Sequence, residues 1–170
     1  MLKCFGALLV FASVLCCGTR PLMYKISRLR VLTEFVYVLE RMKLEMHSHA
    51  PLLPQMLDDV IVDAQGAAKN FLKEVKKVMD EDGAVFFYDE WKRLTRRDLR
   101  MLTERECTSF LVLGDMLGCC AAEEQVDAIV CTISVLQEGL LSTREYIRDR
   151  MKLYLGTSVS VGLIAVIVLL

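Results

Sequence analysis

The chain has 170 residues, 54% of them hydrophobic, and a formal net charge of −1 at neutral pH. Because a nearly neutral chain creates no overall field for polyanions, the composition argues against a general nucleic-acid-binding protein. The charges are unevenly distributed: all acidic residues, and every Lys or Arg except Lys3, lie between residues 19 and 152. Two almost uncharged ends therefore flank a charged middle that is long enough to form one domain.

The N-terminal end, residues 2–18, is apolar apart from Lys3 and reads LKCFGALLVFASVLCCG. Such a stretch is typical of a signal peptide or of a membrane helix. Signal-peptide cleavage requires small residues just before the cut, and the run from Ser13 to Gly18 offers a poor choice of them. We therefore expect an uncleaved transmembrane helix over residues 2–18. The alternative is a secreted or lipid-anchored helical binding domain whose signal peptide has been removed.

The middle, residues 20–152, carries apolar residues at steps of three and four, the spacing of amphipathic helices. Pro51 and Gly66 separate the first three predicted helices, and Thr103 with Glu106 forms a capping box that starts the fifth. The predicted fold is all-α: an antiparallel bundle of about six helices between two transmembrane helices. These helices are expected over residues 21–49, 52–64, 67–80, 85–100, 103–117 and 121 onward.

The core is predicted from the apolar face of each helix. Trp91 and Leu94 lie one turn apart, so we expect Trp91 to be a core residue. The first and last helices should continue directly into the apolar ends and pair antiparallel with each other. Their predicted core stripes are Leu22, Ile26, Leu29, Leu32, Phe35, Val36, Leu39, Met42 and Met46, and then Val126, Ile129, Val130, Ile133, Leu136, Leu140, Ile147 and Met151.

One candidate partner contact is a basic face formed by Arg93, Arg96, Arg97 and Arg100. Acidic neighbours dilute this face, which argues against nucleic acid. A protein partner, anionic lipid head groups and plain solvation remain open.

A second candidate partner contact is the turn over residues 114–125, with Gly114, Gly118 and Gln125. The GxxxG spacing of Gly114 and Gly118 indicates membrane dimerisation only inside an apolar segment, and the flanks here are charged. We expect a close helix crossing at Gly114 and a helix end at Gly118.

The C-terminal end, residues 153–170, reads LYLGTSVSVGLIAVIVLL and carries no charge. At 1.5 Å per residue a helix of this length spans about 27 Å, close to the roughly 30 Å hydrocarbon core of a bilayer. We therefore expect a second transmembrane helix. The residues that flank the two spans on the inner side are basic: Arg20, Lys25, Arg28 and Arg30, and then Arg144, Arg148, Arg150 and Lys152. The positive-inside rule then puts the middle domain in the cytoplasm and both termini outside.

Catalytic and ligand-binding chemistry is not expected. His47 and His49 form an H-x-H pair without further ligands at a metal-site spacing, and no histidine accompanies a nucleophile. The seven cysteines lack a CxxC motif and are interpreted as reduced thiols. One enzymatic alternative remains, a membrane enzyme that uses Cys119 and Cys120 as a redox pair. We predict no catalytic residues, no metal and no cofactor.

The order of features resembles the stage III sporulation protein AB family of endospore-forming bacteria over nearly the whole chain. The segments that carry the resemblance are Met1-Leu2-Lys3, Ala50-Pro51-Leu52, Trp91, Leu102-Thr103, Leu113-Gly114, Leu117-Gly118, Gln125 and Lys152-Leu153-Tyr154. Cys119 and Cys120 depart from the polar residue usual in the family, and Gly156 and Gly162 meet the tail's glycine pattern only in part.

The resemblance implies a component of the channel that links the mother cell and the forespore during endospore formation. It implies a domain similar to the helical cytoplasmic domains of the type II secretion inner-membrane platform protein. The expected location is the mother-cell side of the membrane around the forespore. The expected partners are the sporulation secretion ATPase and other membrane proteins of the same complex. Assembly with further copies of the chain is left open.

Overall fold

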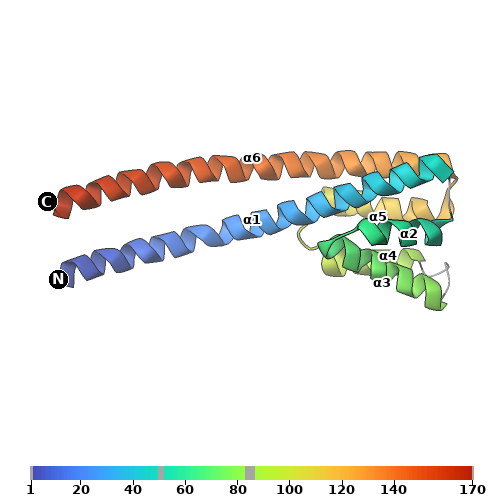
Figure 1. Ribbon diagram of the computed structural model, residues 1–170, viewed down its shortest axis with the longest axis horizontal. Coiled ribbons are helices and arrows are strands. Elements are labelled where there is room, and N and C mark those ends of the chain that lie inside the picture. The colour runs from blue at the N-terminus through green and yellow to red at the C-terminus, as the bar shows by residue number, and fades with distance from the viewer. Residues whose placement is uncertain (1, 50–51, 83–86, 170) are drawn as a thin grey trace. The chain divides into compact units, whose positions relative to one another are not determined.

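In a computed structural model, the backbone is described for residues 2–49, 52–82 and 87–169, and the side chains for residues 23–48, 52–81 and 87–153. All regular secondary structure in these residues is helical, which confirms the predicted all-α class. The described helices follow one another in the predicted order (Figure 1). They are α1 (Leu2–His49), α2 (Leu53–Asp63), α3 (Gly66–Asp82), α4 (Phe87–Asp98), α5 (Glu104–Cys119) and α6 (Ala122–Leu169).

The two long helices, α1 and α6, contain 48 residues each and run without a break into the apolar ends, as predicted. Contacts divide the chain into a helical domain, residues 30–140, and a terminal unit, residues 1–29 with 141–170. Both units take part of α1 and part of α6. The first and last residues of the chain belong to one unit, which agrees with the predicted antiparallel pairing of these helices.

An aromatic cluster forms the centre of the helical domain. Trp91 is fully buried, stacks on Phe110 at 5.1 Å between ring centres, and meets the edge of Phe71 at 4.9 Å. Phe35 of α1 makes edge contacts with Phe71 at 5.7 Å and with Phe110 at 5.1 Å. The Trp91 indole N–H donates to the Phe110 carbonyl at 2.8 Å, so its one polar group is satisfied inside the core. The prediction that Trp91 is a core residue is confirmed.

Most of the predicted apolar stripes are buried, but Ile26, Val130 and Met151 are exposed by 47%, 41% and 52%. Val130 follows the fully buried Ile129 on α6 and is turned about 100° away from it. Its side chain therefore lies at the edge of the face that α6 buries. Ile26 and Met151 belong to the terminal unit, where two helices share a narrow seam instead of a multi-helix core.

The start of α3 is held by a residue from α1. No Ser, Thr, Asp or Asn precedes the helix, and Gly66 adopts the left-handed conformation with φ of 58°. The Glu34 carboxylate accepts a hydrogen bond from the Ala67 backbone N–H at 2.7 Å. It supplies the acceptor and the negative charge that a helix N-terminus favours. A Cβ on Gly66 would lie 2.1 Å from a Glu34 carboxylate oxygen, so this contact also requires glycine.

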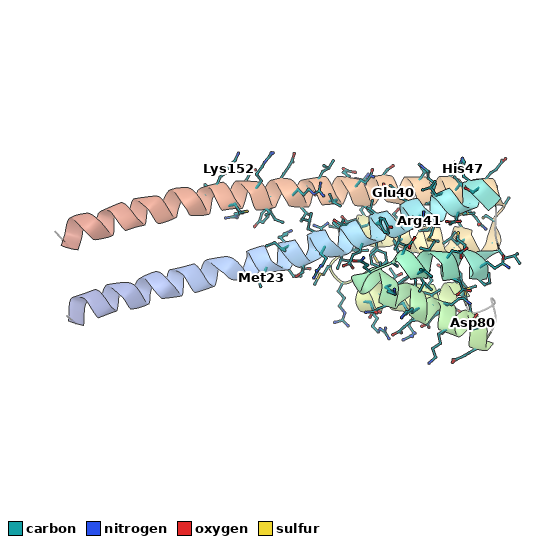
Figure 2. All side chains as sticks on the ribbon, in the orientation of Figure 1. Met23, Glu40, Arg41, His47, Asp80 and Lys152 are labelled. Atoms are coloured by element: carbon teal, nitrogen blue, oxygen red, sulfur yellow. The ribbon has the colours of Figure 1, made fainter. Side chains whose placement is uncertain are left out.

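The predicted capping box at the start of α5 is confirmed. Thr103 accepts from the Glu106 backbone N–H at 3.4 Å, and Glu106 accepts from the Thr103 N–H at 2.7 Å. Polar contacts at the domain surface also join α1 to its neighbours through Glu40 and Arg41, which Figure 2 labels. Arg41 pairs with Asp63 of α2 at 3.1 Å, and Glu40 accepts from Gln137 of α6 at 3.3 Å.

The two predicted spans, residues 2–18 and 153–170, have a helical backbone in the described residues 2–18 and 153–169. Apart from Leu153, their side chains lie outside the described residues. Among the residues whose side chains the structure describes, one stretch, Ala122–Leu153, is long and apolar enough to cross a membrane. This stretch also supplies Ile129 and Leu136 to the core of the helical domain. The core of the helical domain therefore explains part of the apolar character of this stretch. The two spans at residues 2–18 and 153–170 stay a prediction.

Candidate docking surfaces

Two of the four arginines predicted to form a basic face are neutralised by acidic neighbours. Arg93 of α4 donates two hydrogen bonds to the Glu90 carboxylate, one of them at 2.7 Å. Arg97 donates to Asp98 at 2.6 and 2.8 Å, and to Glu74 of α3 at 3.0 Å. These ion pairs tie α4 to α3 and cancel much of the positive charge on that face.

These hydrogen bonds shift the pKa values of several of the groups that they join. The Arg93 guanidinium lowers the pKa of the Glu90 carboxyl, and the Arg97 guanidinium lowers the pKa of Asp98. In return, the bonds from Asp98 and Glu74 raise the pKa of Arg97. Both acidic groups therefore stay ionised, and both ion pairs persist, at neutral pH.

The other two arginines, Arg96 near the end of α4 and Arg100 just beyond it, are exposed. Neither forms an ion pair within the described part of the chain. The helical domain as a whole has thirteen Lys and Arg against twenty acidic residues, a formal charge of −7. Arg96 and Arg100 are thus an unpaired positive site on an acidic domain.

The two glycines of the predicted turn lie in different environments. Gly114 is buried under the Trp91 ring, and a Cβ built on it would lie 2.3 Å from Trp91 Cδ1. The expected close helix crossing is therefore present, and Gly114 is a core residue instead of a surface contact. Gly118 is exposed, and a Cβ there would lie 3.6 Å from the Phe87 ring, an ordinary contact distance.

Gln125, the third predicted contact in this turn, covers the end of α5. Its side-chain amide donates to the Leu117 carbonyl at 3.3 Å and to the Cys120 carbonyl at 2.8 Å. The prediction that α5 stops at Gly118 is wrong by one residue, because the helix ends at Cys119 with Cys120 as its C-cap. A glycine in the left-handed conformation commonly caps a helix at this position, and here the Gln125 amide satisfies the carbonyls at the end of α5 instead.

The adjacent cysteines, Cys119 and Cys120, are both free thiols. A hydrogen bond with Glu124 raises the pKa of the Cys120 thiol, and partial burial adds to the effect. A thiol with a raised pKa carries little thiolate at neutral pH and is a poor nucleophile. This environment disfavours the redox-pair alternative.

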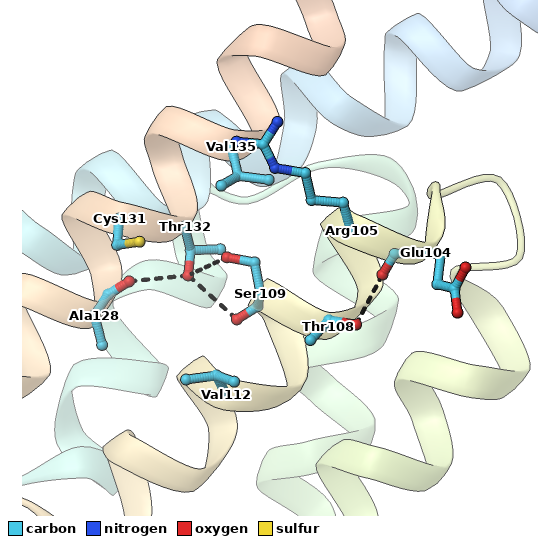
Figure 3. A pocket seen from close by; sticks show the side chains of 9 residues that line it. All are labelled: Glu104, Arg105, Thr108, Ser109, Val112, Ala128, Cys131, Thr132 and Val135. Atoms are coloured by element: carbon cyan, nitrogen blue, oxygen red, sulfur yellow. Dashed lines mark hydrogen bonds between the residues drawn. The ribbon is translucent and has the colours of Figure 1, made fainter.

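A shallow groove of about 620 Å³ separates α5 from α6 (Figure 3). Val112 and Val135 form its apolar wall, and Ser109 and Thr132 bond each other at 3.2 Å across it. Thr132 also donates to the Ala128 carbonyl at 2.9 Å. The hydroxyls of Ser109 and Thr132 thus join the two helices, and the Thr108 hydroxyl donates to the Glu104 carbonyl of its own helix at 2.9 Å. This arrangement has no nucleophile–base geometry.

The comparison with known protein families covers nearly the whole chain. A model of the stage III sporulation protein AB family, spore_III_AB, matches residues 3–170. The chain belongs to this family. No curated protein and no solved structure matches it significantly. Membership in the stage III sporulation protein AB family assigns the protein a role in sporulation as a structural component, and this is not a known family of enzymes.

Proposed function

We propose that the chain is a non-enzymatic membrane scaffold of the channel complex between mother cell and forespore. Spans over residues 2–18 and 153–170 hold the helical domain on the cytoplasmic, mother-cell side of the membrane around the forespore. The observation that carries the proposal is the continuity of α1 and α6, which run unbroken from the domain core into both apolar ends. Two continuous helices transmit position and load between a domain and a bilayer better than flexible linkers do.

A scaffold acts through binding, and the proposed partners are the sporulation secretion ATPase and other membrane proteins of the same complex. Arg96 and Arg100 support docking of an acidic partner surface, because both are exposed and unpaired in the described part of the chain. Arg93 and Arg97 are less suited, since their ion pairs would have to break first. Electrostatic complementarity of this kind contributes mainly to specificity and to the rate of association.

The docking proposal is tested by reversing the two unpaired charges. The full-length protein with Arg96→Glu and Arg100→Glu should retain much less ATPase in a pull-down from membranes than the wild type. The matched control is Lys43→Glu with Lys73→Glu, two exposed cations of the same domain without an ion pair in the described residues. Equal retention by both variants and the wild type would contradict docking at Arg96 and Arg100. Loss of ATPase in the control alone would place the surface elsewhere on the domain.

The secreted or lipid-anchored alternative differs in the fate of residues 2–18. An intact mass that includes Met1, Leu2 and Lys3 in protein purified from membranes is the result expected for the scaffold. A mature protein that begins after residue 18 would instead support the binding domain with a cleaved signal peptide.

A further inference from the structure

A second groove lies within the terminal unit, where α1 and α6 pair. Its volume is about 360 Å³, and its lining combines basic and apolar side chains. The groove is formed by Leu29 of α1 and by Arg144, Ile147, Arg148, Met151 and Lys152 of α6. Figure 2 marks Lys152 on α6.

The basic side of this groove is a row of three cations. Arg144, Arg148 and Lys152 follow one another at four-residue steps, so they share one face of α6. All three are exposed, and none forms an ion pair within the described residues. Like charges four residues apart repel each other, so an anion placed among them would relieve the repulsion.

The other side of the groove is apolar. Leu29 and Ile147 are half-buried, and Met151 remains 52% exposed although the helical periodicity predicts it as core. A free inorganic anion would gain nothing from these residues. A ligand with a negative head and a hydrocarbon chain would use both sides of the groove.

The distribution of charge indicates that the terminal unit, and not the helical domain, attracts an anionic surface. This unit has eight Lys and Arg against two acidic residues, a formal charge of +6, whereas the helical domain carries −7. Lys152, which lines the groove, immediately precedes the uncharged residues 153–170. Lys25 and Arg150 lie over the Tyr146 ring at 5.1 and 5.3 Å, so these two cations of the unit are engaged outside the groove.

We propose that this groove binds an anionic phospholipid. Its phosphate group lies among Arg144, Arg148 and Lys152, and an acyl chain runs along Leu29, Ile147 and Met151. The inference rests on the membrane spans of the proposed function. It adds a specific lipid contact to them, which fixes the depth and rotation of α6 at the membrane surface.

The test uses the full-length protein purified with a mixture of phosphatidylglycerol and phosphatidylcholine, with the bound lipid measured by native mass spectrometry. The groove variant is Arg148→Gln with Lys152→Gln. The control variant, Lys25→Gln with Arg150→Gln, removes the same charge from the same unit outside the groove. We expect the groove variant to retain phosphatidylglycerol on the order of tenfold less than the wild type, and the control variant to retain it nearly unchanged.

A third variant separates a lipid site from a phosphate site. Met151→Gln keeps every cation but removes apolar contact, so it should also reduce retention of phosphatidylglycerol. Displacement of the lipid by millimolar inorganic phosphate, or full retention in Met151→Gln, would overturn the proposal. Equal losses in the groove and control variants would overturn it too, since they would show a diffuse charge effect.

Flotation with neutral phosphatidylcholine vesicles distinguishes failure of the groove from failure of the proposed function. A wild-type chain that does not float contradicts the membrane spans themselves. A chain that floats but shows no preference for phosphatidylglycerol contradicts the groove alone.

Discussion

The helical domain and the terminal unit share the two long helices, α1 and α6. They differ in how far apolar residues are buried and in the sign of their net charge. In the domain, Phe35 of α1 is 1% exposed because α3 and α5 supply Phe71 and Phe110 against it. In the terminal unit, Ile26 of the same helix is 47% exposed. The formal charges are −7 in the domain and +6 in the terminal unit.

Helical periodicity therefore indicates which residues share a face of a helix, but it does not indicate whether protein or membrane covers that face. The domain covers most of its apolar stripe with protein. The terminal unit leaves apolar residues such as Met151 exposed beside a row of unpaired cations, which is the pattern of a membrane–water interface.

The largest effect is expected from Trp91→Ala, which removes the central ring of the aromatic cluster. Loss of a fully buried aromatic side chain costs about 3–5 kcal/mol of unfolding free energy. Chemical denaturation of the full-length protein in detergent measures this loss. Val62→Ala on α2, where the side chain is 75% exposed, is the control and should change stability little. A loss below about 1 kcal/mol for Trp91→Ala would show that the cluster is not the core.

Gly114→Ala and Gly118→Ala should have opposite effects. A Cβ at Gly114 would lie 2.3 Å from Trp91, so Gly114→Ala should cost about 1–3 kcal/mol through overpacking. At Gly118 the nearest atom is 3.6 Å away, so alanine should be neutral or stabilise the helix by up to about 1 kcal/mol. Thermal unfolding of the two variants side by side provides the comparison. Equal shifts in Tm would contradict the close crossing at Gly114.

A smaller loss is expected from Glu34→Ala, which removes the cap of α3. The change should cost about 1 kcal/mol, the usual value of an N-terminal cap. It should also increase amide hydrogen exchange at the first turn of α3. Asp59→Ala, an exposed acid on α2, is the control. Unchanged exchange at Ala67 and Ala68 in Glu34→Ala would argue that the Glu34 contact does not hold this helix.

The smallest expected effect is a change in how steeply Tm falls as the pH is lowered. Because Arg93 and Arg97 lower the pKa values of Glu90 and Asp98 in the folded protein, these pairs add stability at neutral pH. That stability disappears as the pH falls below the ordinary carboxyl pKa of about 4 and passes through the lowered values. Tm measured from pH 6 downward should therefore fall less steeply in the Glu90→Gln, Asp98→Asn variant than in the wild type. Parallel curves would contradict a role for the two pairs.

Much of the fold could be predicted from local patterns. The order of the helices follows from apolar spacing, the start of α5 from Thr103 and Glu106, and the core position of Trp91 from its spacing to Leu94. Each of these signals lies within a few residues of the structure it specifies. The ion pair between Arg93 and Glu90 could also have been predicted, because the two residues lie three positions apart on α4.

Individual side-chain contacts between distant parts of the chain could not be predicted. The cap of α3 by Glu34 joins residues 33 positions apart, and the sequence offers only the missing cap residue before Gly66 as a hint. The pairing of Arg97 with Glu74 requires α3 to lie beside α4. Among the predicted contacts, Gly114 and Gln125 serve the fold, whereas Arg96, Arg100 and Gly118 remain at the surface.

The proposed scaffold requires that both apolar ends cross the membrane while the helical domain stays in the cytoplasm. An alkaline phosphatase reporter fused after Leu170, compared with one inserted after Leu102 between α4 and α5, tests it most directly. We expect phosphatase activity for the fusion after Leu170 and none for the insertion after Leu102. An inactive, cytoplasmic reporter after Leu170 would contradict the C-terminal span and the scaffold built on it.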